Sequence, residues 1–489
     1  MEAHWSIATL SYIFRSFALA AIAVCICVLP GANVKLPWST HPLILWLACI
    51  AFVCWVVSRL LEWKSPRPHE TTAWCLAVLI SAYGWLITCC PSAMVDSLTG
   101  AILDLDKNPW LAFGTIDQGI SEQAMISIST ALMLLVVTLD FASERTTRYV
   151  LALAVTVAGF VTAIAGLWLQ SPADLKELWQ VQHVPNSVFG LFWYHGNTAA
   201  FLNLSWPTGV WLCLLLLRQG QRTFLQQLAL AFLVVAVMLE IVAVFANVSK
   251  MGHLLLIFEM LLLTGAGMVV WKPRMAALPF GKKRLVLFVC IGVGLLVLGA
   301  WLSGAGVGLG RWNIFATRHF DDPARRHAAL MALQIGWDHG RTGIGPGTFE
   351  WVSPHYSALD PVLSEGRWRH AHNDYAEFFA EWGWPGVLIF ILLVALPGRR
   401  LLGALRRAVS GDRRQGMSFQ RRTGLLCFSV AIVSVLLHAV VDFPLQIDAC
   451  RHLFAVMVGI VIAMTRSSGL IAPGRANAGG SERSGLPLV

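Results

Sequence analysis

Six of the fourteen histidines fall between residues 304 and 375, in a polar stretch set between strongly apolar ones. They are His319, His327, His339, His355, His370 and His372. Because its ordinary pKa is close to neutral, an imidazole can act as a general base or hold a reacting hydroxyl. Two of them, His370 and His372, could also bind a metal, but no His-Glu-x-x-His pattern accompanies them, so no metal is predicted. Spacing alone leaves open whether any one histidine is catalytic or structural.

Two adjacent cations, Arg325 and Arg326, stand in the first turn of a helix predicted over 323–339. Asp322 suits the N-cap and Pro323 the first helical position. Cations are unfavourable at this end of a helix, where the macrodipole is positive. A bound anion such as a diphosphate would compensate them, because free backbone N–H groups and two guanidinium groups would surround it. Ion pairs with acidic neighbours are the alternative.

A glycine-rich stretch, Thr342-Gly-Ile-Gly-Pro-Gly-Thr-Phe349, follows that helix. It lacks the Gly-x-Gly-x-x-Gly spacing of dinucleotide-binding loops and does not follow a strand. We therefore expect Gly343, Gly345 and Gly347 to form a tight turn that returns the chain toward a membrane.

A second helix is predicted to begin near Asn373 or Asp374, with Glu377 placed for a capping-box contact. His372 would then lie just before a helix start, where its side chain can point into a cavity between loop and membrane. Other polar residues lie at the ends of apolar segments on the same side. They are His195 and Asn197 before the sixth segment, Ser249 and Lys250 at the end of the seventh, and His438 and Asp442, four apart and so on one helix face, near the end of the eleventh.

The composition predicts the surroundings of these residues: 57% hydrophobic residues, 13% charged residues and 21 Trp leave too little polar surface for a soluble protein. Apolar segments of about 20 residues, enough to cross ~30 Å of hydrocarbon, recur along the chain. They lie near 11–30, 41–61, 72–90, 122–140, 149–169, 198–217, 224–247, 252–271, 285–303, 376–397, 423–441 and 447–465. The prediction is an all-α polytopic membrane protein with about twelve transmembrane helices and one large extracytoplasmic loop containing helices.

The distribution of Lys and Arg predicts the orientation, since cytoplasmic loops are rich in both. It places both termini in the cytoplasm and the large loop outside, and it explains the net charge of +9 without a nucleic-acid partner. The expected division is membrane helices over 1–303, a catalytic loop over 304–375, membrane helices over 376–465 and a disordered tail over 466–489. The eleven cysteines show no Cys-x-x-Cys spacing and predict neither a zinc site nor disulfides.

The order of these motifs resembles the O-antigen ligase and polymerase superfamily. Its loop pattern has an Arg, a Gly-x-Gly-x-Gly-x-Phe turn, and His-Asn-x-Tyr followed by Glu-x-Gly-x-x-Gly. Here these are Arg325 or Arg326, Gly343 to Phe349, His372 to Tyr375, and Glu381-Trp-Gly-Trp-Pro-Gly386. The segments around Asn197, Lys250 and His438 to Asp442 are also similar, so the resemblance covers roughly residues 120–465. Two positions depart from the family pattern: Lys250 replaces a more usual Arg, and Ser187 stands where an Arg is often found.

The resemblance implies a bacterial inner-membrane glycosyltransferase with its loop in the periplasm. It would move a glycan from an undecaprenyl-diphosphate carrier to an acceptor hydroxyl with inversion, without a metal or other cofactor. The acceptor would be the lipid A core or another envelope molecule in a ligase, and a second carrier-linked chain in a polymerase. His372 would be the base or positioning residue, and Arg325 or Arg326 with Lys250 would bind diphosphate. Supporting roles would fall to Asn373, Tyr375, His438, Asp442, His195 and Asn197.

Two other classes of protein remain as alternatives. A twelve-helix transporter would carry paired half-repeats and polar residues through the bilayer centre, whereas the polar residues here gather at one interface. A non-catalytic assembly protein of an envelope pathway is the other, and the intact set of His and Arg argues against it. The sequence does not distinguish ligase from polymerase, and it does not predict the sugar, the acceptor or the oligomeric state.

Overall fold

The computed structural model describes residues 6–33, 41–62, 68–96, 102–104, 114–169, 188–219, 221–271, 322–358, 360, 362–363, 367–410 and 417–465. Its helices are α1 (Ile7–Val28), α2 (His41–Glu62), α3 (Pro68–Thr88), α4 (Gln118–Phe141), α5 (Arg145–Trp168), α7 (His195–Leu217), α8 (Phe224–Ala246), α9 (Lys250–Trp271), α12 (Pro323–Asp338), α13 (Phe349–Ser357), α14 (Asp374–Ser410), α15 (Phe419–His438) and α16 (Asp448–Met464). Strands β1 (Ala93–Val95) and β2 (Ile102–Asp104) form an antiparallel hairpin.

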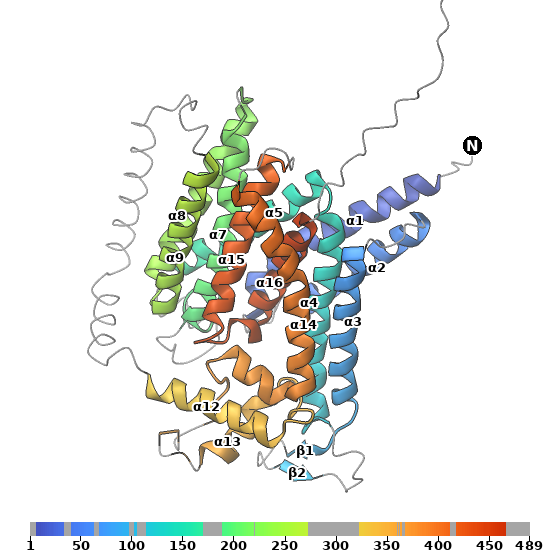
Figure 1. The fold of residues 1–489 in the computed structure, drawn as a ribbon, viewed down its shortest axis with the longest axis vertical. Coiled ribbons are helices and arrows are strands. Elements are labelled where there is room, and N and C mark those ends of the chain that lie inside the picture. Colours follow the sequence, from blue (N-terminus) through green and yellow to red (C-terminus); the bar gives the residue numbers. More distant parts are fainter. Residues whose placement is uncertain are drawn as a thin grey trace, which may run out of the picture.

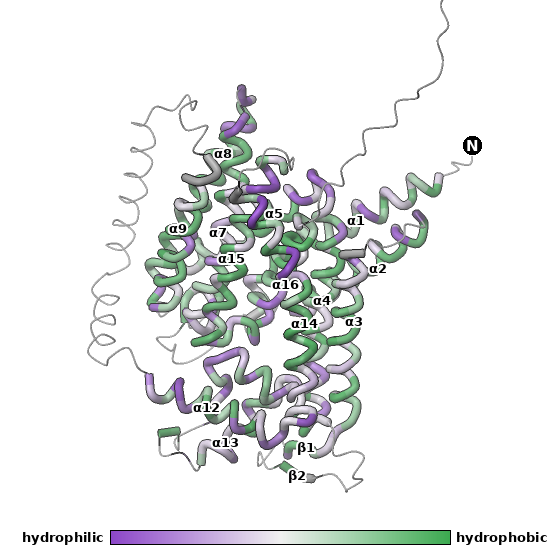
Figure 2. Tube along the Cα trace, in the orientation of Figure 1, coloured by the Kyte–Doolittle hydropathy of each residue, from purple (hydrophilic) through white to green (hydrophobic). Residues whose placement is uncertain are grey.

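The long helices form a membrane bundle, as predicted (Figure 1). In the described part of the chain, ten helices are long and apolar enough to cross a membrane, and α16 adds a shorter apolar helix of 17 residues. Every predicted span except that near 285–303 coincides with one of these helices; that span and the predicted tail lie outside the described residues. Figure 2 shows the hydrophobic colouring along the bundle and more hydrophilic segments at its two ends. The all-α polytopic fold class is confirmed.

Helix α7 lies at the centre of the bundle, with nearly every residue from Gly196 to Cys213 buried. It packs against α5, α8 and α15, and more sparingly against α9 and α16. Small residues permit this close approach: a side chain at Gly209 would clash with Val237 of α8, and one at Gly424 would clash with Met464 and come within 3.0 Å of Trp211. A rigid central helix gives the residues at its first turn a fixed position.

Helices α12 and α13 and the β-hairpin form a layer over one end of the bundle, which we call the loop side (Figure 1). The layer has its own apolar core, including Met331, Ile335, Phe349, Val352 and Ala371. Helix α12 begins as predicted, with the Asp322 carboxylate accepting the N–H of Arg325 and proline in the first turn.

The two glycine motifs of the loop side meet in one joint. Gly343, Gly345 and Gly347 all have positive φ, and Gly383 (φ 59°) interrupts α14. The N–H of Gly345 donates to the carbonyl of Glu381 over 3.0 Å. A Cβ on Gly343 would lie 2.2 Å from that same carbonyl oxygen, so only glycine fits there. The joint fixes the start of α14, and with it His372, against the end of α12.

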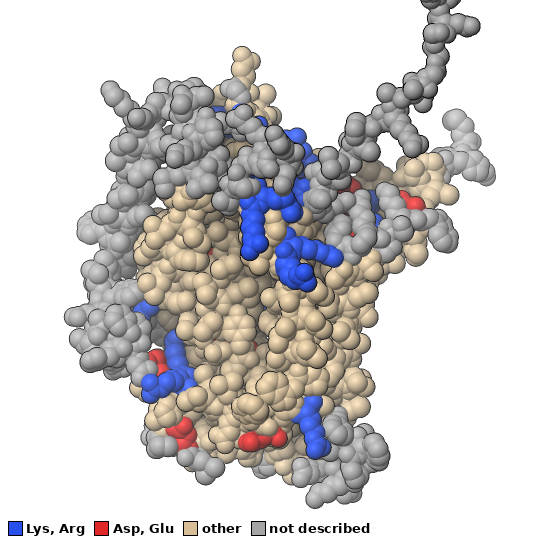
Figure 3. Space-filling model, viewed as in Figure 1, with Lys and Arg blue, Asp and Glu red and all other residues tan. Residues whose placement is uncertain are grey.

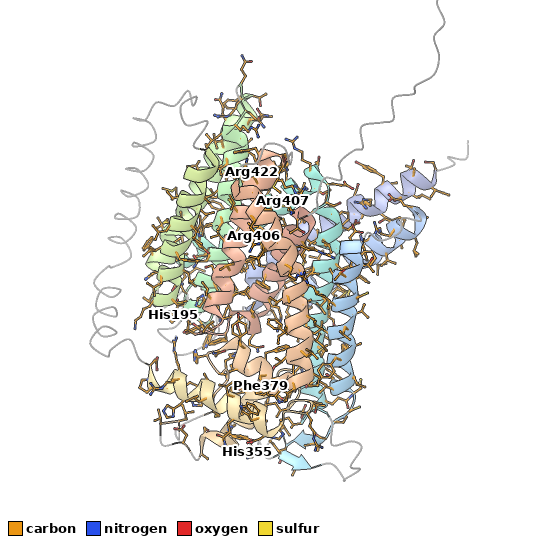
Figure 4. The ribbon with its side chains drawn as sticks, viewed as in Figure 1. His195, His355, Phe379, Arg406, Arg407 and Arg422 are labelled. Atoms are coloured by element: carbon orange, nitrogen blue, oxygen red, sulfur yellow. The ribbon has the colours of Figure 1, made fainter. Side chains whose placement is uncertain are left out.

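Arginines gather at the opposite end of the bundle. Arg406, Arg407 and Arg422 lie far from His355 of the loop side (Figure 4). Figure 3 shows most of the visible basic side chains over that end, whereas basic and acidic side chains occur together near α12. The two ends of the molecule therefore differ in charge.

Candidate functional site

His372 lies where the loop-side layer meets the bundle, immediately before α14. Its φ is 52°, and no other residue except glycine has a positive φ in the described ranges. Histidine enters this conformation more readily than bulky residues do, at a cost of about 1–3 kcal/mol. Two hydrogen bonds fix the segment: the N–H of Asp374 donates to the carbonyl of Ala439 (2.9 Å), and the N–H of Leu445 donates to the Asp374 carboxylate (2.9 Å). The imidazole is thereby held against the turn that follows α15.

Asp442, in that turn, holds the imidazole. Its Oδ1 lies 3.2 Å from Nδ1 of His372 and its Oδ2 lies 3.7 Å from Nε2 of His438. Burial opposes its ionisation, but the hydrogen bond with His372, the nearby ring of His438 and the guanidinium of Arg325 hold the pKa of Asp442 well below its usual value. A charged carboxylate at this distance favours the tautomer with a proton on Nδ1 of His372, which leaves Nε2 to accept a proton.

One detail of this pairing differs from the prediction. Because α15 ends at His438 and Ala439 is its C-cap, Asp442 does not share a helix face with His438. The helix instead gives way to a turn, in which the N–H of Val441 donates to the carbonyl of His438 (3.0 Å). The turn, and not helical spacing, brings the two side chains together.

Arg325 reaches the same site from α12. One of its Nη atoms donates to the hydroxyl of Tyr194 over 2.7 Å, and its Nε lies 3.3 Å from the Asp322 carboxylate. Burial and the negative charge of Asp442 raise the pKa of Tyr194, so that its hydroxyl stays neutral. Tyr194 thus lies between Asp442 of the bundle and Arg325 of the loop-side layer. Arg326 stands beside Arg325 in the first turn of α12, where its N–H donates to the carbonyl of Asp322 (3.1 Å).

The first turn of α7 supplies the next group. His195 opens this helix as predicted, and its ring meets that of Tyr194 with centroids 4.6 Å apart. Asn197 is buried, and its side-chain oxygen has no hydrogen-bond partner within the described residues. The Asn247 side chain donates to the carbonyl of His195 over 2.7 Å, which ties the end of α8 to this turn.

Lys250 belongs to the start of α9 and not to the end of the seventh span, so the prediction for Ser249 and Lys250 was wrong in this respect. The hydroxyl of Ser249 accepts the N–H of Gly252 (3.2 Å), as expected of a residue that precedes a helix. The Asn247 side chain accepts the N–H of Ser249 (2.9 Å). Lys250 therefore lies three residues from the contact with His195, at the same end of the bundle.

Asn373 and Tyr375 have local structural contacts. The side-chain oxygen of Asn373 accepts the N–H groups of Tyr375 and Ala376, each over 3.0 Å, and so caps α14. The hydroxyl of Tyr375 donates to the carbonyl of Leu436 (2.9 Å).

The predicted capping box of Glu377 was wrong. Its carboxylate instead accepts the N–H of Ala371 (2.7 Å) and lies 2.9 Å from Nδ1 of His370. The contact reaches further back than a capping box because the left-handed conformation of His372 reverses the chain. Glu377 therefore stabilises the bend that carries His372.

Sequence reasoning missed the aromatic wall of the site. Tyr194 and Phe443 stack with centroids 5.1 Å apart, and the His372 ring lies edge-on to Phe443 at 4.9 Å. It also missed Gly196, where a Cβ would lie 2.6 Å from Oδ2 of Asp442. In the sequence, these residues are notable only as neighbours of His195 and Asp442. Such a position does not reveal a contact between distant segments. Among the described residues, no group of three or more His, Cys, Asp and Glu is arranged to hold a metal ion.

Comparison with known proteins gives one match. Residues 232–391 match the family model described as O-antigen ligase. The matched segment runs from α8 into α14 and contains Lys250, Arg325 and His372, whereas Tyr194 and Asp442 lie outside it. No curated protein matches the chain.

Proposed function

The chain belongs to the O-antigen ligase superfamily, and from that premise we propose that it transfers a glycan from an undecaprenyl-diphosphate carrier to an acceptor hydroxyl. The observation that carries the proposal is the arrangement around His372. The His372 imidazole, held by Asp442, meets the ring of Tyr194 with centroids 6.1 Å apart, and the hydroxyl of the same tyrosine accepts a hydrogen bond from the guanidinium of Arg325. A base next to a cation is what displacement of a diphosphate by a hydroxyl requires.

In the proposed reaction, Nε2 of His372 takes the proton of the acceptor hydroxyl. The hydroxyl oxygen attacks the anomeric carbon from the face opposite the diphosphate, so the new C–O bond forms with inversion. The bond from that carbon to the diphosphate oxygen breaks, and the diphosphate leaves with the electron pair. Charge stabilisation and positioning suffice, because a diphosphate is already a good leaving group.

The diphosphate would bind at the start of α12. A guanidinium has five N–H donors, so the contacts of Arg325 with Tyr194 and Asp322 leave others for phosphate oxygens. Arg326, the N-terminal turn of α12 and Lys250 would add positive charge, while His195 and Asn197 support the turn that carries Tyr194. Lys250 would act as a point charge, not as a bidentate fork.

We place this chemistry at the periplasmic face of a bacterial inner membrane, with both chain ends in the cytoplasm. The arginines at the far end of the bundle support this orientation, because cytoplasmic segments are enriched in them. Residues 304–375 would then form the periplasmic catalytic loop between membrane helices over 1–303 and 376–465. Ligases and polymerases would share the chemistry and differ in the acceptor, which is the lipid A core or another envelope molecule for a ligase.

The test is transfer by purified protein in lipid vesicles, with a carrier-linked radiolabelled glycan and both kinds of acceptor. His372→Asn should lower the rate by at least about 100-fold, since no base remains. Asn suits this position because it also tolerates positive φ, so the fold should be retained. His355→Asn, at an exposed position of α13, is the matched control and should keep full activity. Undiminished transfer by His372→Asn would exclude the proposed mechanism.

A further inference from the structure

A cavity opens next to Phe443, on the side of its ring away from Arg325. It is a cavity of about 1180 Å³ between α3, α4, α14, α15 and α16, which we call the α4/α16 cavity. His370 lines it, whereas His372, Arg325 and Tyr194 do not. The rings of His370 and His372 both contact Phe443, with centroids at 4.3 Å and 4.9 Å. One end of the cavity therefore lies next to His372, the proposed base. Phe443 separates this end from the proposed diphosphate site at Arg325.

The walls of the cavity suit a hydrocarbon chain. Along the middle of the bundle they consist of apolar side chains such as Leu132, Phe390, Val394, Leu436 and Val458. Most polar side chains line the loop-side end, where α4, α14 and α16 contribute Ser127, Asp374 and Arg451, while Thr465 lines the opposite end. A lipid would match these walls, because its apolar tail would lie along the helices and its polar head at the loop-side end.

Two buried polar atoms at that end need a partner. Oδ1 of Asp374 and Nε of Arg451 have no hydrogen-bond partner among the described residues, and Asp374 is only 4% exposed. A buried donor or acceptor without a partner costs about 1–3 kcal/mol. Since the cavity offers one atom of each kind, a ligand with hydroxyl groups, which both donate and accept, would satisfy the two together.

The charges at this end favour a hydroxylated head over a phosphorylated one. Asp448 contacts Arg451, accepts from the hydroxyl of Ser127 (2.6 Å) and lies 2.8 Å from His41. The guanidinium is thus already neutralised. The carboxylate of Glu377 also lines the cavity and would repel a diphosphate, whereas Arg369, which lines it too, is paired with Glu350 at 3.9 Å. The carrier diphosphate therefore fits the Arg325 side better.

We propose that the α4/α16 cavity binds the hydrocarbon anchor of the acceptor, a lipid with a hydroxylated, sugar-like head seated at Asp374 and Arg451. This rests on the proposed function and assigns the two substrates to opposite sides of Phe443: the donor diphosphate at Arg325 and the acceptor at His370. The acceptor hydroxyl would reach His372 from the cavity.

The experiment uses photolabelling of the purified protein in vesicles by three probes with a diazirine in the chain. The probes are an acyl-chain glycolipid with an unphosphorylated sugar head, a phospholipid with the same chains, and a polyprenyl diphosphate. The glycolipid should label α4 and α16, and unlabelled glycolipid should compete with it. Leu132→Trp, or independently Val458→Trp on the facing wall, should reduce this labelling by about tenfold, a change of 1.4 kcal/mol. Leu153→Trp, on the exposed face of α5, is the matched control and should leave labelling unchanged.

Labelling does not depend on catalysis, so the two proposals fail separately. Specific glycolipid labelling without transfer in any assay would keep the binding site and exclude the transferase. Equal labelling by the phospholipid, preferential labelling by the polyprenyl diphosphate, or glycolipid labelling that survives both Trp variants would overturn the acceptor site, even if transfer is found.

Discussion

At the scale of single residues, the structure singles out one histidine from the several that the loop contains. His372 differs from the other described histidines of the loop in its backbone, which is in the left-handed region. Asp442 holds its ring, as Asp360 pairs with His327 at 2.7 Å and Glu377 pairs with His370, but only His372 is held by a residue of the turn after α15. Strain that neighbouring segments maintain is typical of functional positions. Sequence motifs pointed to His372 only through resemblance, because neither its φ nor its contact with Asp442 follows from spacing.

We expect Asp442→Asn to lower kcat by roughly 10²–10⁴-fold with little change in the KM for the donor. An amide cannot stabilise the imidazolium that forms at His372, and it can hold the ring in the wrong tautomer. The measurement is steady-state transfer kinetics of the purified variant. A KM effect without a kcat effect would mean that Asp442 acts on binding and does not position the base.

The same carboxylate should link stability to acid pH. The pKa of Asp442 is lower in the folded chain than its value of about 3.9 in an unfolded one. Its charge therefore stabilises the fold at neutral pH, and this contribution is lost as the pH falls below about 4 toward the lowered folded value. Between pH 5 and pH 3, where that loss begins, the melting temperature of the wild type should fall more than that of Asp442→Asn. Parallel curves for the two proteins would contradict this reasoning.

At the scale of elements, the joint between the glycine turn and the break in α14 positions the site. Both motifs were visible in the sequence, and the turn was predicted from its glycines. Their mutual contact was not predictable, because the hydrogen bond from Gly345 to Glu381 joins residues that are distant in the chain. The same limit explains the error for His438 and Asp442: a turn after α15 replaces the helical geometry that local periodicity favours.

Gly343→Ala should destabilise the loop-side layer by about 1–3 kcal/mol, because a side chain there meets the Glu381 carbonyl and is strained at positive φ. We expect transfer activity to fall with the fraction of folded layer, measured by proteolysis of the purified variant. Gly265→Ala, in α9 with no atom within 4 Å of the added Cβ, is the control and should be neutral or slightly stabilising. Equal behaviour of the two variants would exclude a structural role for the joint.

We expect the carboxylate of Asp140 in α4 to hold α1 and α2 against α4. Its carboxylate is 3% exposed and lies 3.2 Å from Arg15, 3.4 Å from Arg59 and 2.9 Å from Nε1 of Trp55. Removing it takes one of two carboxylate partners from each arginine, since Arg15 keeps Glu144 and Arg59 keeps Glu70, and it leaves the indole N–H of Trp55 without its acceptor. Asp140→Ala should therefore cost about 1–3 kcal/mol. Thermal unfolding in detergent would measure the loss. Glu144→Ala, which removes a more exposed partner of Arg15, should cost no more than about 1 kcal/mol.

At the scale of the whole molecule, hydropathy predicted the bundle well. Each described span lies close to its predicted position because about 20 apolar residues can hardly adopt another structure in a membrane. The helix order around α7, and hence the meeting of α7, α12 and the turn after α15, was not predictable. It depends on packing between helices whose apolar surfaces look alike in sequence.

The asymmetry between the two ends of the molecule makes the orientation testable. His355 and Arg406 are exposed at opposite ends of the bundle (Figure 4). His355→Cys and Arg406→Cys would be made in a background in which the exposed Cys75 and Cys89 are replaced by Ser. In cells with a permeabilised outer membrane, an impermeant maleimide should modify His355→Cys at once and Arg406→Cys only after lysis, because arginine-rich ends stay in the cytoplasm. The reverse pattern would put His372 on the cytoplasmic side, out of reach of a periplasmic acceptor, and would exclude the proposed function.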